Sequence, residues 1–257
     1  MSKKTFEIEK LKIEDTELLA RVESFFSAGG KKEGDLLDDE FGIELQYCSI
    51  LQSSTTSIDV GEGPFKDIKY GDFFLEDMAL GNEIDLIPLV MWGDRAYFVQ
   101  DTSSPICKSP DSVTPIDTTK FAKKCENCQF SKWEGKKPPA CTKSLNILFV
   151  PSDFKSTPFV LKFSRSGARL GKDIAKLTKR NSKAVYETTF TLATKQETKN
   201  KRRFYVPIKK GTFLTDSALF PALKFIQQKY LDVVRGFTTR HHKTEETDTD
   251  TPPSNIV

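Results

Sequence analysis

The sequence predicts a mainly β protein with a few helices, an α+β fold organised as a small barrel. Short apolar runs at strand spacing recur from Phe41 to Ile208. A stretch of helical spacing at residues 168–180 lies between two of these runs, and a polar, cysteine-bearing segment lies between two others. Short strands around one helix and one inserted loop are typical of small barrels, and an OB-like Greek key is the arrangement that we expect.

The strand pattern starts at Phe41. Phe41, Ile43, Leu45 and Tyr47 alternate with glycine or polar residues, which predicts a half-buried strand. The clearest hairpin is expected around Gly93-Asp94, because an apolar run lies on each side of this turn dipeptide. We expect strands at 41–47, 83–92, 95–99, 145–150, 158–164, 186–192 and 203–208, and a short ordered piece that begins at 71–75. A turn is expected at 151–153 and a hydrophilic connector at 194–202.

Helical spacing appears in three places. Leu170, Ile174 and Leu177 recur at helical spacing within 168–180, and basic residues occupy the other faces. Residues 5–27 carry a looser pattern that stops at two glycines, and residues 217–237 form a further helix candidate that ends near Gly236. We therefore expect an N-terminal helical or partly ordered segment at 1–40, the OB-like core at 41–210 with an insertion at 105–143, a C-terminal helix at 211–240 and a disordered acidic tail at 241–257.

The composition is that of a soluble protein on the polar side. Of 257 residues, 37% are hydrophobic and 29% are charged, which is enough to bury the core of one large or two small domains. No apolar run is long enough to span a membrane, and the start of the chain lacks the apolar stretch of a secretory signal. We therefore expect an intracellular protein, in a compartment where clustered cysteines bind metal more often than they form disulfides.

Four of the five cysteines fall in one segment. Cys125 and Cys128 form a C-x2-C pair, and Cys107 and Cys141 flank it in a polar, lysine-bearing stretch. Zinc takes four such ligands at tetrahedral corners, and a C-x2-C turn supplies two of them, so we predict a structural Zn²⁺ site. A catalytic zinc is not expected, because four thiolates would leave no open coordination position for water. A redox role would need a βαβ pattern, which is absent. The remaining alternative is that four thiols fall in this segment by chance. Cys48 stands apart among apolar neighbours and is expected to be a buried thiol.

Charge is segregated along the chain, although the net charge is only +3. Acidic residues outnumber basic ones up to Asp101, whereas basic residues dominate from Lys162 to Lys210 and interleave with aromatic rings. Cations that follow phosphates, beside rings that stack on bases, are typical of single-stranded nucleic-acid binding. A solvated helix face with a lysine-rich loop, or a transport or heparin-type patch at 201–203, is the alternative. The expected nucleic-acid contacts are Trp133, Lys162, Arg165, Arg169, Lys172, Lys176, Lys179, Arg180, Tyr186, Lys201, Arg202, Arg203 and Tyr205.

The end of the chain is acidic, because every charged side chain after Lys243 is Asp or Glu. The simpler interpretation of this tail is a terminus that only increases solubility. The functional hypothesis is an electrostatic mimic, which occupies the basic surface when DNA is absent and is released to contact replication or recombination proteins when DNA binds.

Catalytic interpretations are weak. The two histidines, His241 and His242, are adjacent and precede the tail, which removes most histidine-based schemes of acid–base or nucleophilic catalysis. No glycine-rich phosphate-binding motif is present. Acidic pairs such as Asp38-Asp39 and Glu76-Asp77 could hold magnesium, but adjacent carboxylates without a supporting signature are usually solvated. We therefore expect a protein that is not an enzyme and has no catalytic residue.

The order of these features resembles a known family. Cys107 is followed by the C-x2-C pair, Trp133, Cys141, a strand start at 145–147, the run Pro-Phe-Val-Leu-Lys-Phe-Ser at 158–164 and a late aromatic strand at 204–207. This order is similar to that of zinc-containing single-stranded DNA-binding proteins of tailed phages and mobile elements. The resemblance implies an OB-type core with an inserted structural zinc element, a basic cleft and an acidic C-terminus that contacts partners. One departure is the all-cysteine set, since the best-known phage sites of this type include a histidine.

The sequence thus predicts a single-stranded DNA-binding protein for phage or mobile-element replication or recombination. If it is phage-encoded, its location is the host cytoplasm. The alternative from a different class is a zinc-stapled protein–protein adaptor, or a transcription or replication regulator that binds a polymerase through its acidic N-terminal half.

Overall fold

The computed structural model describes residues 16–17, 19–22, 45–53, 60, 67–75, 78–99, 102, 104–118, 120–181, 184–199 and 201–239. The chain divides into two compact units. We call Met1–Gly93 with Lys143–Tyr230 the sheet unit, and Asp94–Thr142 with Leu231–Val257 the cysteine unit. Residues 16–17 and 19–22 are helical, in agreement with the expected N-terminal helix. The remainder of 5–27 and the expected tail at 241–257 lie outside the described residues.

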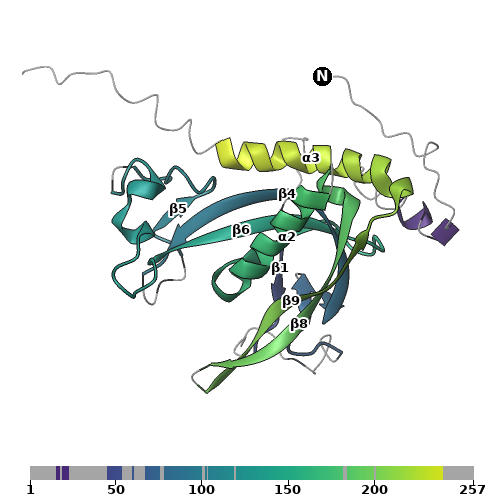
Figure 1. Ribbon diagram of the computed structural model, residues 1–257, viewed down its shortest axis with the longest axis horizontal. Coiled ribbons are helices and arrows are strands. Elements are labelled where there is room, and N and C mark those ends of the chain that lie inside the picture. The colour runs from purple at the N-terminus through teal and green to yellow at the C-terminus, as the bar shows by residue number, and fades with distance from the viewer. Residues whose placement is uncertain are drawn as a thin grey trace, which may run out of the picture. The chain divides into compact units, whose positions relative to one another are not determined.

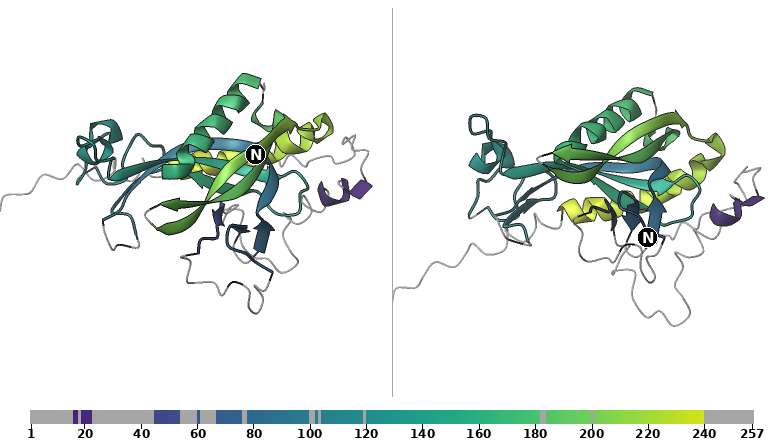
Figure 2. Two further views of the ribbon diagram at one scale, coloured as in Figure 1. Left: turned by 60° about the horizontal axis from the view of Figure 1, so that its bottom comes forward. Right: turned by 90° about the horizontal axis from the view of Figure 1, so that it is seen from below.

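The protein is mainly β, and one strongly curled mixed sheet organises the sheet unit (Figure 1). The strand order is β3-β2-β1-β7-β6-β4-β8-β9. Strands β1 and β7 are parallel, whereas β1 with β2, β2 with β3, β6 with β7, β4 with β8 and β8 with β9 are antiparallel. Figure 2 shows the sheet from two further directions. The strands are β1 (Gln46–Ile50), β2 (Phe73–Leu75), β3 (Met78–Gly81), β4 (Glu83–Tyr97), β6 (Cys141–Pro151), β7 (Phe159–Phe163), β8 (Thr188–Lys199) and β9 (Arg202–Leu214).

One face of the sheet packs on helix α2 (Ala168–Asn181) and forms the hydrophobic core. Ile174 is fully buried in this core, and Leu170 and Leu177 pack against it, so the predicted apolar stripe of the helix is confirmed. A Cβ atom at Gly171 would lie 2.7 Å from Cβ of Phe163, so the helix approaches β7 more closely than a larger residue allows. The other buried members of the core are Cys48, Phe73, Leu75, Leu86, Ile147, Phe149, Phe159, Leu161, Phe163, Phe190 and Leu192.

Helix α3 (Phe220–Thr239) follows a short 3-10 turn, η8 (Ser217–Leu219), and confirms the predicted C-terminal helix. It continues past Gly236, where we expected it to end. Its Gln227 donates a 2.7 Å hydrogen bond from Nε2 to the carbonyl oxygen of Leu89 in β4, and Leu223 and Ile226 are buried. No described helix combines the length and the apolar character that crossing a membrane requires.

Two predicted connections are wrong, because both are strands. Gly93-Asp94 is not a turn, since β4 continues through it to Tyr97. Residues 83–86 of β4 pair with β8 and Arg95–Tyr97 pair with β5 (Cys107–Ser109), so different partners hold the two halves extended. The hydrophilic stretch 194–202 is paired as far as Lys199 with Arg202, although its side chains are largely exposed. Backbone hydrogen bonds rather than apolar burial therefore define this ladder.

The first strand buries a different face from the one predicted. Tyr47 is 47% exposed, whereas Cys48 is 6% exposed and belongs to the core. Phe41 and Ile43 lie outside the described residues. The expectation of a buried Cys48 thiol is confirmed, and burial raises its pKa to about 12. The strands expected at 145–150 and 158–164 and the turn between them are also confirmed.

Candidate metal centre and nucleic-acid interface

The four cysteines predicted as metal ligands line one small apolar pocket in the cysteine unit. Cys107 comes from β5, Cys125 and Cys128 from two successive 3-10 turns, and Cys141 from the start of β6. The turns are η4 (Cys125–Asn127) and η5 (Gln129–Ser131). The free volume of about 10 Å³ suits one small ion and is too small for an organic ligand.

Backbone hydrogen bonds hold the C-x2-C turn in shape. The Cys125 N–H donates to the Val113 carbonyl at 2.7 Å, and the Cys128 N–H donates to the Cys125 carbonyl at 3.2 Å. The Ser131 hydroxyl donates to the carbonyl oxygens of both cysteines. These bonds satisfy the polar backbone of a loop that has little secondary structure of its own.

Three rings form the apolar wall of the pocket. The Tyr97 ring stacks on Phe130 with centroids 4.4 Å apart and an interplanar angle of 19°. Phe121 meets both rings edge-on, at 6.4 Å from Tyr97 and 6.1 Å from Phe130. The sequence gives no periodic signal for these rings, and only the C-x2-C spacing could have drawn attention to Phe121 and Phe130 beside it.

The thiols influence one another's protonation. Burial is the largest cause that raises the pKa of Cys107, to about 11, and the charges of Cys141, Cys125, Cys128 and Asp117 also contribute to this rise. Burial also raises the pKa of Cys141, while the charge of Arg95 and a side-chain hydrogen bond from it act in the opposite direction. Cys107 is therefore a protonated thiol at neutral pH in the metal-free protein, and a bound cation would have to expel its proton.

The donor set fits zinc by number and chemistry. Within the described ranges, no group of three or more His, Cys, Asp or Glu side chains already lies at the mutual spacing of a finished metal site. The four cysteines line one small apolar pocket, however, and sulfur is a donor that zinc accepts in structural sites. A Zn²⁺ ion held here would need the thiols to move closer together, and it would have no open coordination position.

The predicted cations of α2 share one exposed face. Arg169, Lys172 and Lys176 follow one another at helical spacing, on the side opposite to the buried Ile174. Lys179 and Arg180 extend this face to the last turn of the helix. In the part of the chain that the structure describes, none of these cations forms an ion pair.

A second group of cations lies at the β8–β9 hairpin, which projects beyond the rest of the sheet (Figure 1). Lys201, Arg202 and Arg203 are exposed at its tip. Arg165 belongs to η6 (Arg165–Gly167), the turn before α2. This turn lies beside β9, since a Cβ atom at Gly167 would be 3.7 Å from Cγ of Pro207. The cations of α2, η6 and the hairpin therefore belong to one unit, and we call them the basic surface.

Two of the predicted contacts do not belong to the basic surface. Lys162 alternates with the buried Leu161 and Phe163, so its side chain is exposed on the sheet face opposite to the core. Tyr47, which sequence reasoning missed, is on that same outer face, because it pairs with Val160 in the register of β1 and β7. Trp133 is 67% exposed but belongs to the cysteine unit.

The two predicted tyrosine contacts are more buried than expected. Tyr186 is 9% exposed and meets Phe220 edge-on at 5.6 Å, so its ring offers no free face to a base and the prediction is corrected. Tyr205 is half-buried, and a Cβ atom at Gly71 would lie 2.7 Å from its ring. The Tyr205 N–H donates to Gln52 Oε1 at 2.7 Å, and Gln52 Nε2 donates to the Tyr205 carbonyl at 2.9 Å. Tyr205 therefore has a structural role at the edge of β9.

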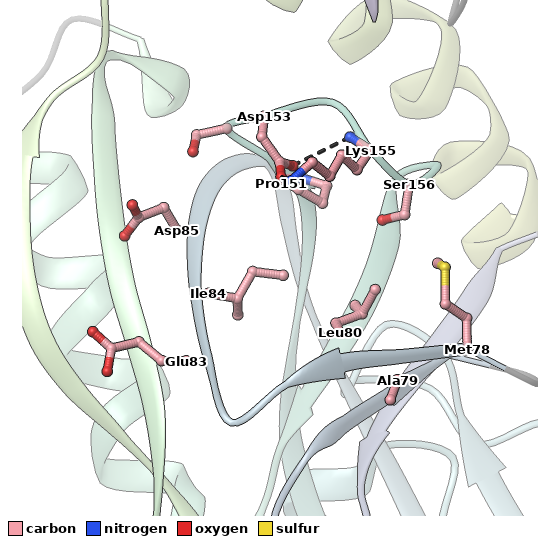
Figure 3. Close-up of a pocket in the computed structure, with 11 residues that line it drawn as sticks. Met78, Ala79, Leu80, Glu83, Ile84, Asp85, Pro151, Asp153, Lys155 and Ser156 are labelled. Carbon is pink, nitrogen blue, oxygen red and sulfur yellow. Dashed lines mark hydrogen bonds and ion pairs between the residues drawn. The ribbon is translucent and has the colours of Figure 1, made fainter. Parts of the chain in front are cut away.

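A larger cleft of about 360 Å³ lies in the sheet unit, between β3, the start of β4 and the turn after β6 (Figure 3). Leu80 and Ile84 point into it, while Glu83 and Asp85 lie on the other side of the strand. Asp85 accepts a 2.6 Å hydrogen bond from the Thr191 hydroxyl, and Glu83 forms an ion pair with Lys210. Asp153, the third carboxylate that lines the cleft, forms an ion pair with Lys155 at 3.2 Å. All three carboxylates are therefore already paired, which makes the cleft a poor candidate for acid–base or metal chemistry.

Known proteins give no guide to the function of these sites. No protein-family model, no curated protein and no solved structure matches the chain. The interpretation therefore rests on the chemistry of the cysteine pocket and the basic surface.

Proposed function

We propose that this chain binds single-stranded DNA through the basic surface, with a structural Zn²⁺ in the cysteine pocket. The observation that carries this proposal is the exposed, unpaired state of the α2 cations among the described residues. Cations that lack acidic partners are free to replace the counterions of a nucleic-acid backbone, and the release of those counterions drives binding.

The conformation of two cations supports a role in binding. Arg165 has φ of 48° and Lys201 has φ of 65°, both in the left-handed region that favours glycine. A non-glycine residue in this region costs on the order of 1 kcal/mol. A cation at these positions therefore carries a conformational cost without an ion pair in the described structure to offset it, which is typical of residues retained for a ligand.

We further propose that the core is an OB-like barrel. Strands β4, β6 and β7 are neighbours in the sheet, α2 follows them in the chain, and the β8–β9 hairpin then returns to pair with β4. Three strands, a helix and a returning hairpin in this order agree with the connectivity expected of an OB-type Greek key. The seam between the two ends is bridged by Gln52, just after β1, which bonds to Tyr205 of β9.

The OB-like interpretation gives both candidate regions a function. In this interpretation the five barrel strands are β4, β6, β7, β8 and β9. The cysteine segment lies between the first two of them, β4 and β6, and the hairpin turn connects the last two, β8 and β9. These are the two connections through which OB barrels bind oligonucleotides. In this proposal the zinc holds the connection that carries Lys132, Trp133 and Lys136, and the hairpin presents Lys201, Arg202 and Arg203.

Exposed rings favour a single strand over a duplex. Trp133 is 67% exposed and Tyr47 is 47% exposed, with Lys162 on the neighbouring strand on the same face as Tyr47. Bases can stack on such rings only when they are not already stacked in a duplex. Each stacked base contributes about 1–3 kcal/mol of binding free energy.

The test is a titration of fluorescent oligo-dT, and of a duplex of equal length, across a salt series. We expect tighter binding to oligo-dT and a steep loss of affinity as salt rises. The double substitution Lys172→Gln with Lys176→Gln should reduce the salt dependence, whereas Lys224→Gln, an exposed lysine on α3, is the matched control. Equal binding of both nucleic acids, or no salt dependence, would remove the proposal.

A second candidate function, a protein–protein adaptor, is favoured by one observation. Phe98, Val99 and Ile106 are each more than 40% exposed at the end of the β4–β5 ribbon. The Ile106 N–H donates to the Tyr97 carbonyl at 2.9 Å, which places these apolar side chains at one tip. Exposed apolar groups of this kind are typical of docking surfaces. An adaptor would retain the zinc but show no salt-sensitive affinity for oligo-dT.

A further inference from the structure

One cation beside the cysteine pocket, Arg95, is half-buried and is not one of the proposed metal ligands. Arg95 lies in β4, opposite Ser109 of β5 in the antiparallel ladder, and Tyr97 is opposite Cys107. Because alternate residues of a strand share a face, Arg95 projects from the same side of the ribbon as Tyr97 and Cys107. This is the side on which Tyr97 and Cys107 line the pocket.

The hydrogen bonding of Arg95 is incomplete. Its side chain donates to Cys141. Its Nε atom is buried and has no partner, and in the described part of the chain Arg95 forms no ion pair with an Asp or Glu. A buried guanidinium N–H without an acceptor is costly, and a negative charge beside this half-buried side chain would offset that cost.

A zinc ion with four thiolates supplies that charge. Such a centre carries a net charge of about −2, which is itself unfavourable in an apolar pocket. N–H groups that donate to the ligand sulfurs, and a cation close to them, reduce this cost. The lysines that neighbour the C-x2-C turn, Lys123 and Lys124, are exposed to solvent and are less effective in this role.

We propose that Arg95 is a positioning residue for the metal centre, which holds the Cys141 thiolate by N–H···S hydrogen bonds and neutralises part of the charge of the four-sulfur site. This inference rests on the proposed zinc site. It assigns to β4 a part in metal binding as well as in the sheet, since the strand that supplies Arg95 also supplies Leu86 to the core.

The experiment compares the native protein with the variants Arg95→Gln and Arg95→Lys, each loaded with Zn²⁺ and separately with Co²⁺. Zinc affinity is measured by competition with a chromophoric chelator, and the sulfur-to-cobalt charge-transfer band reports the ligand sulfurs directly. Lys108→Gln is the matched control, because Lys108 is an exposed cation on the other face of the same ribbon.

We expect Arg95→Gln to bind zinc about 10–100-fold more weakly and to shift the charge-transfer band, Arg95→Lys to lie between, and Lys108→Gln to match the native protein. Native affinity and an unchanged cobalt spectrum in Arg95→Gln would overturn the role of Arg95 and leave the zinc site intact. If Arg95→Gln does not fold, the same two readouts on Arg95→Lys decide, because that change keeps the charge and loses the planar donor pair. Absence of stoichiometric metal in the native protein would overturn the zinc proposal itself.

Discussion

The sheet unit and the cysteine segment 94–142 differ in what can hold them together. The sheet unit buries Phe73, Phe149, Phe159 and Phe190 completely. Among the described residues of the cysteine segment, the buried apolar side chains are Cys125, Pro110 and Pro115. A segment of this size that buries so little apolar surface is usually held by a metal or by crosslinks. The comparison therefore agrees with the proposal that metal-bound cysteines take the place of a large core in this segment.

Removal of metal gives the largest expected difference between the two regions. A strong chelator, or Cys128→Ser, should unfold the cysteine segment, because about 10–16 kcal/mol of apparent zinc-binding free energy is then lost to folding. Hydrogen exchange followed by mass spectrometry should show rapid exchange of amides in 94–142 and continued protection of the buried residues 146–150 of β6 and of β7. Cys48→Ala is the control, because Cys48 lies in the sheet core and should leave metal content unchanged. Unaltered protection of 94–142 after complete metal removal would contradict the comparison.

Acid should act on the cysteine segment first. The pKa of Cys107 is raised to about 11 and that of Cys141 is also raised, so these two thiols hold their protons at neutral pH in the metal-free protein. Zinc must displace those two protons, and its affinity therefore falls as pH falls, by about two orders of magnitude per pH unit. Chelator competition between pH 6 and 8.5 measures this slope. A flat profile would mean that thiolates are not the ligands.

A cavity in the core tests the sheet unit in the opposite way. Phe149→Ala should lower the free energy of unfolding by about 3–5 kcal/mol, because the Phe149 side chain is completely buried. Its ring packs edge-on against Phe163, with the ring centroids 6.5 Å apart. Chemical denaturation with far-ultraviolet circular dichroism gives the value. Phe98→Ala, at a position that is 45% exposed in the cysteine segment, should change it by less than about 0.5 kcal/mol. Similar losses from both changes would show that the two regions do not differ as described.

The elements that sequence reasoning predicts best are those with a strong local pattern. Helix α2 was readable from Leu170, Ile174 and Leu177, because one apolar stripe decides both its spacing and its packing. The grouping of the four cysteines in one pocket could be predicted for a different reason, since C-x2-C spacing reflects ligand geometry and not the fold, and their role as metal ligands stays a prediction. Both signals are local, so no knowledge of the tertiary structure was needed.

The predictions that were wrong depend on partners distant in sequence. Gly93-Asp94 has the composition of a turn, but β8 and β5 pair on either side of it and keep β4 extended. The stretch 194–202 lacks apolar alternation, because the hairpin there projects from the sheet and buries neither face. Tyr186 was assigned to the basic surface by its neighbours in sequence, whereas its contact is Phe220 of α3. Arg95 could not be found at all without the ladder that brings it to the cysteine pocket.

A methyl group added to α2 tests how tightly this helix packs against the core. Gly171→Ala places a Cβ atom 2.7 Å from Cβ and 2.9 Å from Cγ of Phe163, which is buried and cannot move aside. The change should lower the free energy of unfolding by about 1–3 kcal/mol, even though alanine favours a helix over glycine by about 1 kcal/mol. Thermal unfolding measures the loss. Gly236→Ala in α3 is the control, since a Cβ atom there meets no neighbour within 4 Å and should stabilise the helix.

The smallest change in stability is expected for a substitution of Arg165, which tests whether this residue serves binding or folding. Arg165 has φ of 48°, so Arg165→Gly removes backbone strain together with the charge. We expect a free energy of unfolding that is unchanged or higher by up to about 1 kcal/mol, because the glycine backbone adopts this conformation freely. Affinity for oligo-dT should fall, and the slope of log affinity against log salt should decrease by about 0.7 for one lost phosphate contact on a single strand.

Arg165→Lys completes this test, because it keeps the charge and the strain. It should retain most of the affinity and the full salt slope. If Arg165→Gly instead lowers stability and leaves the affinity for oligo-dT unchanged, the arginine is a structural residue of the turn before α2. A gain in stability with a loss of affinity, by contrast, is the pattern of a residue kept at a conformational cost for its ligand. Lys201→Gly, at φ of 65° on the hairpin, should behave in the same way if α2 and the hairpin contact one strand.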